Sequence, residues 1–264
     1  MPKVIKIKKG LEIPLTGKVT GPESVDTQTR VFGIVPDDYP GYRWKCAVKE
    51  GDIVAAGDPL LFAKEDEDIK LTAPVAGKVR EVKRGERRKI EYVSVEKSNS
   101  QESRKFDAKA SRPADIISVL KNSGLYALLR QRPFDTVPFQ VERPRDIFVT
   151  AFDTAPLAPE MLAASNADLE KGLEVLGKIS EGKVYLSVAA GSNITSRYAE
   201  VYEFEGPHPA GNVGTQIANI RPVNKGEVVW TLDALTAIRI GRLFAGGNLD
   251  FSARVALTLS LIHI

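Results

Sequence analysis

Hydrophobic and polar positions alternate along the first part of the chain, and the pattern predicts strands there. Residues 3–10, "KVIKIKKG", alternate with period two, as a half-buried strand does. Residues 29–64 form short apolar runs that are cut by Pro, Gly and Asp turns. Residues 77–97, "GKVREVKRGERRKIEYVSVEK", indicate a hairpin with Gly85 at its tip. We therefore predict an all-β first domain over residues 1–97.

A polar connector and helices are expected next, over residues 98–143. Residues 98–112 are poor in apolar side chains. Residues 113–134, "PADIISVLKNSGLYALLRQRPF", carry an apolar face at helical spacing, and Ser123 and Gly124 could break this stretch into two short helices.

The pattern changes again from residue 144 and predicts an α/β domain over residues 144–258. Strands are expected in 145–152, 182–190 and 198–206, with an amphipathic helix over 167–180 between the first two. This order is typical of parallel strands. Residues 206–223 are predicted to be a Gly/Pro-rich loop, and 226–247 a strand that runs into a helix closed by Gly246 and Gly247. The fold class is α+β and multi-domain, with a β-rich first domain and a Rossmann-like second one.

Composition excludes several classes of protein. The 264 residues carry a formal net charge of +3, which does not argue for nucleic acid. One cysteine, Cys46, and two histidines cannot supply an iron–sulfur cluster or a structural zinc site. No apolar run approaches the ~18 residues of a membrane span. We expect a soluble protein without a direct membrane span.

Residues 57–79, "GDPLLFAKEDEDIKLTAPVAGKV", resemble the biotinyl/lipoyl carrier fold, in which glycine turns reverse short strands around a small core. Counted back from "TAP", the position of the carrier lysine is Asp66, and an aspartate cannot form the amide link to biotin or lipoate. Lys64 and Lys70 lie off the expected hairpin tip. We predict a domain without a prosthetic group, in which residues 65–68 form either a solvated turn or a docking contact.

Other motifs leave alternatives open. Residues 83–89, "KRGERRK", are either a charged tip that favours solubility or a docking patch for an acidic face, and they lack the aromatic residues that stack on bases. The turn after the first α/β strand carries Pro156 and Pro159 instead of the glycines of a dinucleotide site. His208, between two prolines, is either a structural histidine of its loop or a proton or ligand contact.

Several long motifs, among them "IKIKKGLEIPLTGK", "GLYALLRQRPFDTVP" and "EGPHPAGNVGTQIANIRPV", resemble the NqrA subunits of the Na+-translocating NADH:quinone oxidoreductases (Na+-NQR). The likeness covers residues 3 to about 258. It implies a peripheral subunit on the cytoplasmic face of the bacterial inner membrane, within a six-subunit complex that reduces ubiquinone with NADH and exports Na+. It also implies that the NADH, flavin and iron–sulfur sites lie in other subunits, with no covalently bound cofactor here.

The resemblance places this protein near the quinone end of the electron path. The segments implicated match residues 35–42 and 125–134, and the quinone-proximal candidates are Tyr39, Gly41, Tyr42, Arg43, Tyr126, Arg130, Arg132 and Phe134. Aromatic rings can flank a quinone and arginines can donate to its carbonyls or bind a partner's carboxylates. The same aromatic residues could equally be packing residues.

Departures from the family pattern accompany the likeness. Many relatives carry histidine where this chain has Gln216 and Asn219, which weakens any proton-handling role of that loop. Residues 259–264, "LSLIHI", are expected to be a non-native tail in which His263 has no functional weight.

Three functions fit the sequence. The first is a subunit, inactive alone, of the respiratory sodium pump that helps to form a quinone site. The second is a purely structural docking subunit that does not contact quinone. The third is a free-standing carrier-type protein, which the aspartate at position 66 disfavours.

Overall fold

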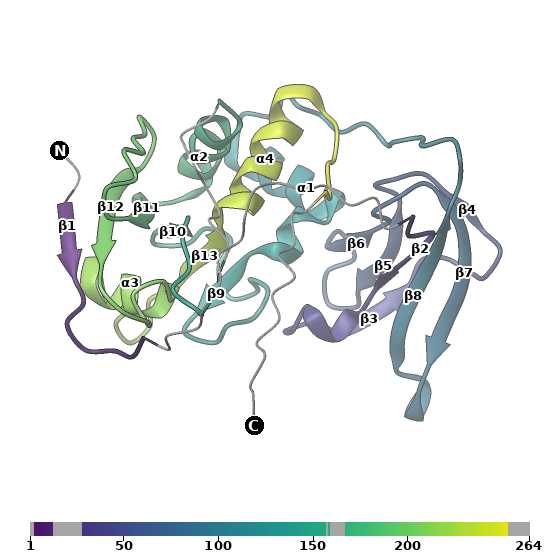
Figure 1. The fold of residues 1–264 in the computed structure, drawn as a ribbon. Helices are drawn as coiled ribbons and strands as arrows, with labels where there is room; N and C mark the ends of the chain where they lie inside the picture. Colours follow the sequence, from purple (N-terminus) through teal and green to yellow (C-terminus); the bar gives the residue numbers. More distant parts are fainter. Residues whose placement is uncertain (1–2, 13–27, 157, 159–166, 253–264) are drawn as a thin grey trace.

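The first half of the chain folds into two small antiparallel sheets (Figure 1). The computed structural model describes residues 3–12, 28–156, 158 and 167–252. One sheet has the order β2-β8-β7-β4 and comprises β2 Val31–Ile34, β8 Ile90–Lys97, β7 Gly77–Arg84 and β4 Ile53–Val54. The other has the order β3-β5-β6 and comprises β3 Trp44–Cys46, β5 Pro59–Ala63 and β6 Lys70–Thr72. Two 3₁₀ turns, η1 Pro36–Asp38 and η2 Glu86–Arg88, punctuate the strands.

This part confirms the expected β-rich domain and both expected hairpins. Strands β7 and β8 pair from Gly77↔Lys97 to Arg84↔Ile90, and η2 forms the tip beside Gly85. Strands β5 and β6 form the hairpin that carries Asp66 in its turn. Inward side chains alternate along the strands, and the buried set includes Leu60, Leu61, Ile69, Leu71, Val79, Val93 and Val95.

The segment that joins the domains is only partly helical. Helix α1, Pro113–Ser123, ends at Gly124 in a left-handed conformation, and a 3₁₀ turn, η3 Leu125–Leu128, follows. The chain then becomes strand β9, Arg130–Arg132, which pairs antiparallel with β13. The helical prediction for 113–134 is therefore correct up to Ser123, and wrong from Arg130 because pairing with a distant strand determines the conformation there.

The second domain is a six-stranded sheet with the order β1-β12-β11-β10-β13-β9, in which only β9 is antiparallel. Its other strands are β1 Lys3–Lys6, β10 Ile147–Thr150, β11 Val184–Ala189, β12 Glu200–Glu205 and β13 Val229–Asp233. Helices α2 Ala167–Ile179 and α4 Ala234–Gly246 pack with the apolar core on one face. Helix α3 Val213–Ile220 lies on the other face, where Ile217 packs against Phe148 and Tyr185 (Figure 1).

Two elements differ from expectation. Strand β1 pairs in parallel with β12, so the first residues of the chain belong to the α/β sheet and not to the first domain. Alternation predicts a strand but not its partner. Helix α3 lies inside the expected loop, where flanking Pro and Gly residues conceal a two-turn helix. The expected tail, residues 259–264, lies outside the described residues.

A continuous apolar core joins the two domains. It runs from the strands of the first domain through Leu120 of α1 and Leu125 of η3 to Ile147 and Ile240 of the second. None of the helices that the structure describes has the length and apolar character needed to cross a bilayer.

Candidate functional site at the hairpin tip

Asp66 stands at the turn between β5 and β6, where the carrier likeness predicts it. One carboxylate oxygen accepts from the backbone N–H of Asp68 at 3.1 Å, and the other forms an ion pair with Lys121 at 2.6 Å. Both side chains are largely covered, with 34% and 23% of their surface exposed. A carrier lysine at this position would place a second ammonium group beside Lys121. The acid therefore fits its surroundings, and the attachment residue does not.

Contacts with α1 hold the whole hairpin in place. Lys70 Nζ donates to the side-chain oxygen of Asn122 at 2.6 Å. The hydroxyl of Thr72 donates to the carbonyl of Ser123 at 3.0 Å. Together with the Asp66–Lys121 ion pair, these bonds tie strand β6 and the turn to one end of the helix. The structure thus favours the docking-contact alternative for Asp66, and the docking partner is this chain's own helix.

The two segments that the family likeness implicates lie against each other beside this tip. The hydroxyls of Tyr42 and Tyr126 both donate to the carbonyl of Pro138, at 2.7 and 3.3 Å. The guanidinium of Arg130 donates to the carbonyl of Asp38 at 2.8 Å. The ammonium of Lys121 lies 5.6 Å from the ring centroid of Tyr126, so the ion pair and the tyrosines form one cluster. We call this cluster the tip junction.

The charge environment keeps the junction tyrosines neutral. Burial, reinforced by the carboxylates of Asp66 and Glu65, raises the pKa of Tyr42 far above its ordinary value near 10. Burial does the same for Tyr126, whose pKa Tyr42 and Asp66 raise further. Burial also raises the pKa of Tyr39. These phenols can therefore donate hydrogen bonds but cannot accept a proton as phenolates at neutral pH.

The remaining predicted residues form the rim of the junction. A side-chain hydrogen bond from Arg43, 2.6 Å long, lowers the pKa of Glu65. Arg132 pairs with Asp135 at 3.2 Å, and Phe134 is 59% exposed. Gly41 has a φ of +112°, and a Cβ there would lie 3.0 Å from Thr136, so the close approach of the two segments requires glycine.

A pocket of about 190 Å³ opens between the domains next to Tyr39. Its wall is mainly apolar, with Arg239 as its one charged residue, and the lining comprises Ile34, Tyr39, Leu71, Thr72, Pro74, Gly124, Leu128, Arg239 and Phe251. An apolar cavity of about 150 Å³ can hold a benzene ring. The pocket therefore has room for a single ring, and Tyr39 is the predicted site residue that borders it.

His208 lies away from the junction, near the carboxyl ends of the parallel strands. Its Nδ1 lies 3.1 Å from the hydroxyl of Thr154, which also accepts from the backbone N–H of Gly211 at 2.9 Å. The carbonyl of His208 accepts from Leu11 at 3.0 Å. These contacts agree with the structural alternative for this histidine. Gln216 is fully buried and donates to Thr150 at 2.9 Å, which fixes α3 on the sheet.

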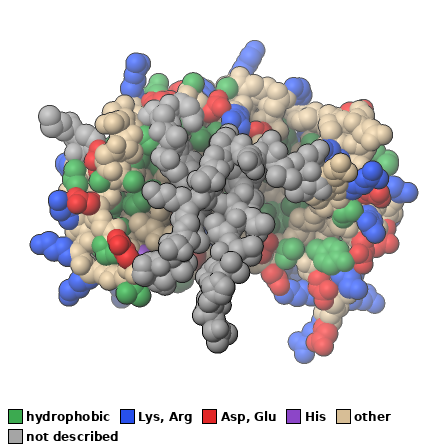
Figure 2. Space-filling view, in the orientation of Figure 1, with side chains coloured by type: hydrophobic (Ala, Val, Ile, Leu, Met, Phe, Trp, Pro, Cys, Tyr) green, Lys and Arg blue, Asp and Glu red, His purple; other side chains and the backbone are tan. Residues whose placement is uncertain are grey.

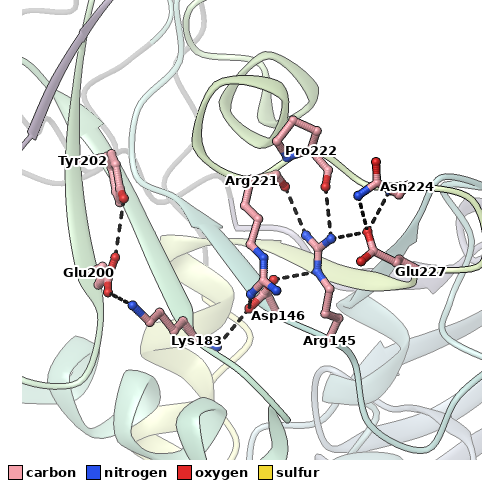
Figure 3. Close-up of polar contacts among 9 residues, drawn as sticks. All are labelled: Arg145, Asp146, Lys183, Glu200, Tyr202, Arg221, Pro222, Asn224 and Glu227. Atoms are coloured by element: carbon pink, nitrogen blue, oxygen red, sulfur yellow. Dashed lines mark hydrogen bonds and ion pairs between the residues drawn. The ribbon is translucent and has the colours of Figure 1, made fainter.

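The sequence analysis missed a charged network at the amino ends of the strands. Figure 3 shows Arg145 and Arg221 directed at the fully buried carboxylate of Asp146, at 2.7 and 3.0 Å. The backbone N–H of Lys183 donates to the same carboxylate at 3.0 Å. Ligands of open α/β sheets bind at the opposite edge. This network therefore positions β10, β11 and the loop before β13. A charged residue directly before the apolar run "IFVT" is its only sequence signal.

The fold and the junction define a class: a two-domain protein whose carrier-like hairpin is fixed to its own helix and lacks an attachment lysine. Comparison with known families agrees. Residues 5–98 match the NqrA N-terminal barrel-sandwich hybrid domain, and residues 112–249 match the NqrA second alpha/beta domain. The chain belongs to the NqrA family of Na(+)-translocating NADH-quinone reductase subunits.

Curated relatives are named as this same subunit of the reductase. The protein from Neisseria meningitidis serogroup A is 38% identical over 274 residues, which cover 98% of this chain and 61% of the relative. Those from Marinomonas sp. and Yersinia pestis are 37% and 36% identical, and the matches cover 57% and 59% of their lengths. The chain thus spans about three fifths of the relatives that it matches.

Proposed function

We propose that this chain is a docking subunit of a Na+-translocating NADH:quinone reductase, on the cytoplasmic face of the bacterial inner membrane. The complex would comprise six subunits, reduce ubiquinone with NADH and export Na+, and this subunit would be inactive alone. NADH, flavins and iron–sulfur clusters would be held by other subunits, and no prosthetic group would be attached here. Family membership supports the complex, and the fixed, lysine-free tip supports a docking role.

We propose further that the subunit contributes to the quinone-reducing end through the tip junction. The single observation that carries this proposal is the mainly apolar, ring-sized pocket beside Tyr39, between the two domains. Arg239 supplies a cation at its wall, and the neutral Tyr39 hydroxyl supplies a donor for a carbonyl oxygen. Arg130 holds the carbonyl of Asp38, next to Tyr39, and so positions that ring.

The α/β domain is proposed to be Rossmann-like, because the parallel strands β12-β11-β10-β13 place the first strand of the series between the second and the last. Pro156 follows the first of these strands where a dinucleotide site needs glycine, which supports a domain that does not hold NADH itself.

A photoreactive quinone analogue applied to the assembled complex tests the quinone proposal. We expect label in residues 35–42 and 125–134, competed by excess quinone. Tyr39→Phe and Arg239→Gln should each weaken labelling several-fold, whereas Tyr198→Phe, on an exposed ring elsewhere, should not. Complexes that assemble normally and carry no label in either segment would refute the quinone contact.

The second candidate, a purely structural docking subunit, is favoured by the Asp66–Lys121 ion pair, because that pair immobilises the element that a carrier would move. Normal activity and labelling of the complex with Tyr39→Phe and Arg239→Gln together would support it. Intact-mass measurement after co-expression with a biotin or lipoate ligase tests the carrier alternative, and we expect an unchanged mass.

A further inference from the structure

The β7–β8 hairpin extends beyond the rest of the first domain and ends in a cluster of cations (Figures 1 and 2). Its two strands are eight residues each, the longest that the structure describes. The tip comprises residues 83–89, "KRGERRK". Every side chain there except the partly covered tip glycine is exposed. The hairpin thus holds five basic residues away from the core.

The turn at this tip has unusual residues for its geometry. The carbonyl of Glu86 accepts from the backbone N–H of Lys89 at 3.1 Å, and the two central residues, Arg87 and Arg88, have φ of +53° and +62°. Positive φ at both central positions is the type I′ turn, for which Asn-Gly is the favoured pair. Side chains other than Gly, Asn and Asp are strained in this conformation. The fold therefore does not require arginine at either position.

Most of these cations have no anionic partner. Lys89 pairs with Asp37 at 2.6 Å. Lys83, Arg84, Arg87 and Arg88 form no ion pair with any residue in the part of the chain that the structure describes, although the guanidinium of Arg84 donates to the carbonyl of Arg88 at 3.3 Å. Four such positive charges on one projecting turn repel each other, and a nearby anionic surface would relieve that repulsion.

We propose that the β7–β8 tip binds the anionic phospholipid headgroups of the membrane beside the complex. The tip residues 83–89 contain no aromatic or aliphatic side chain that could serve as the buried anchor of a protein interface. A charged lipid surface requires no anchor, because Lys and Arg are attracted to it within a Debye length. The strained Arg-Arg pair is explained because it adds two cations at the outermost point of the hairpin.

The test uses the full-length purified protein and vesicles of phosphatidylcholine with about 30% phosphatidylglycerol. The variant Arg87→Asn with Arg88→Gly installs the favoured turn pair and removes two cations. We expect it to melt roughly 2–6 °C higher, because the strain is gone, and yet to bind the vesicles about tenfold or more weakly, at about fivefold per cation. This opposite movement of stability and binding separates the proposal from a folding defect.

The control variant removes two exposed lysines elsewhere, Lys109→Asn with Lys225→Asn, at the same cost in net charge. It should bind like the parent protein. Binding should vanish on pure phosphatidylcholine and at 0.5 M salt. Equal loss in both double variants would show a net-charge effect and overturn the proposal. So would unchanged vesicle binding of the tip variant, and if that variant then failed to join the complex, an acidic protein partner would be the ligand. The quinone labelling above is independent of either result.

Discussion

At the scale of single residues, Asp66 decides what the first domain can do. Its two carboxylate oxygens are used by its own turn and by Lys121. The substitution that converts a carrier position into an acid therefore removes the attachment point and adds a bond to the neighbouring helix. One residue both ends the carrier function and immobilises the hairpin.

A charge exchange tests this interpretation. Asp66→Lys should lower the free energy of unfolding by roughly 1–2 kcal/mol, because it breaks a partly buried ion pair and sets two ammonium groups together. The double variant Asp66→Lys with Lys121→Asp should recover most of that loss in urea unfolding. Glu67→Lys, an exposed neighbour, serves as the control and should be nearly neutral. No recovery in the double variant would mean that Asp66 acts only through its turn.

The junction tyrosines predict an alkaline limit of stability. Burial raises the pKa of Tyr42 and Tyr126 in the folded protein, so the folded state keeps protons that the unfolded state releases near pH 10. Their contribution is fully present below pH 10 and is lost as the pH rises above it. In absorbance titration near 295 nm, we expect these two phenols to ionise only on unfolding. Tyr126→Phe should flatten the alkaline loss of stability, and Tyr198→Phe should leave it unchanged.

At the scale of elements, what the sequence predicts depends on how local its cause is. Helix α2, the parallel strands and the closure of α4 before Gly247 follow from periodicity and caps, and the structure confirms them. Strand β9 and the pairing of β1 depend on distant strands and could not be predicted from local pattern. Lys121 and Pro138, which complete the tip junction, give no sequence signal because only tertiary packing brings them to Asp66 and the tyrosines.

The packing of α2 against α4 gives a prediction at this scale. A Cβ on Gly241 would lie 1.8 Å from the carbonyl oxygen of Asp168, so the two backbones approach as closely as glycine allows. Gly241→Ala should therefore cost roughly 1–3 kcal/mol in urea unfolding. Gly177, on the exposed side of α2, has open space at its Cβ. Gly177→Ala should instead stabilise by about 0.5–1 kcal/mol, and a loss in both variants would indicate a helix-wide effect.

At the scale of the whole molecule, the apolar core and the hairpin–α1 bonds make one unit of two domains. The chain contains two tryptophans, and they fall in different domains: Trp44 in β3 and Trp230 in β13. If the domains share their stability, Trp44→Phe and Trp230→Phe variants should each report one urea transition by fluorescence. The two midpoints should shift together when Lys121→Ala is added, because that change removes a bond at the domain boundary.

Independent domains would behave differently. Lys121→Ala would then move only the Trp44 signal, which reports the hairpin domain, and the two midpoints would separate. Coupled unfolding matters for the proposed function, because the pocket beside Tyr39 is lined from both domains and exists only while they stay together. A ligand held there would therefore raise both midpoints equally. A shift of one midpoint alone would place the ligand inside a single domain, away from the pocket.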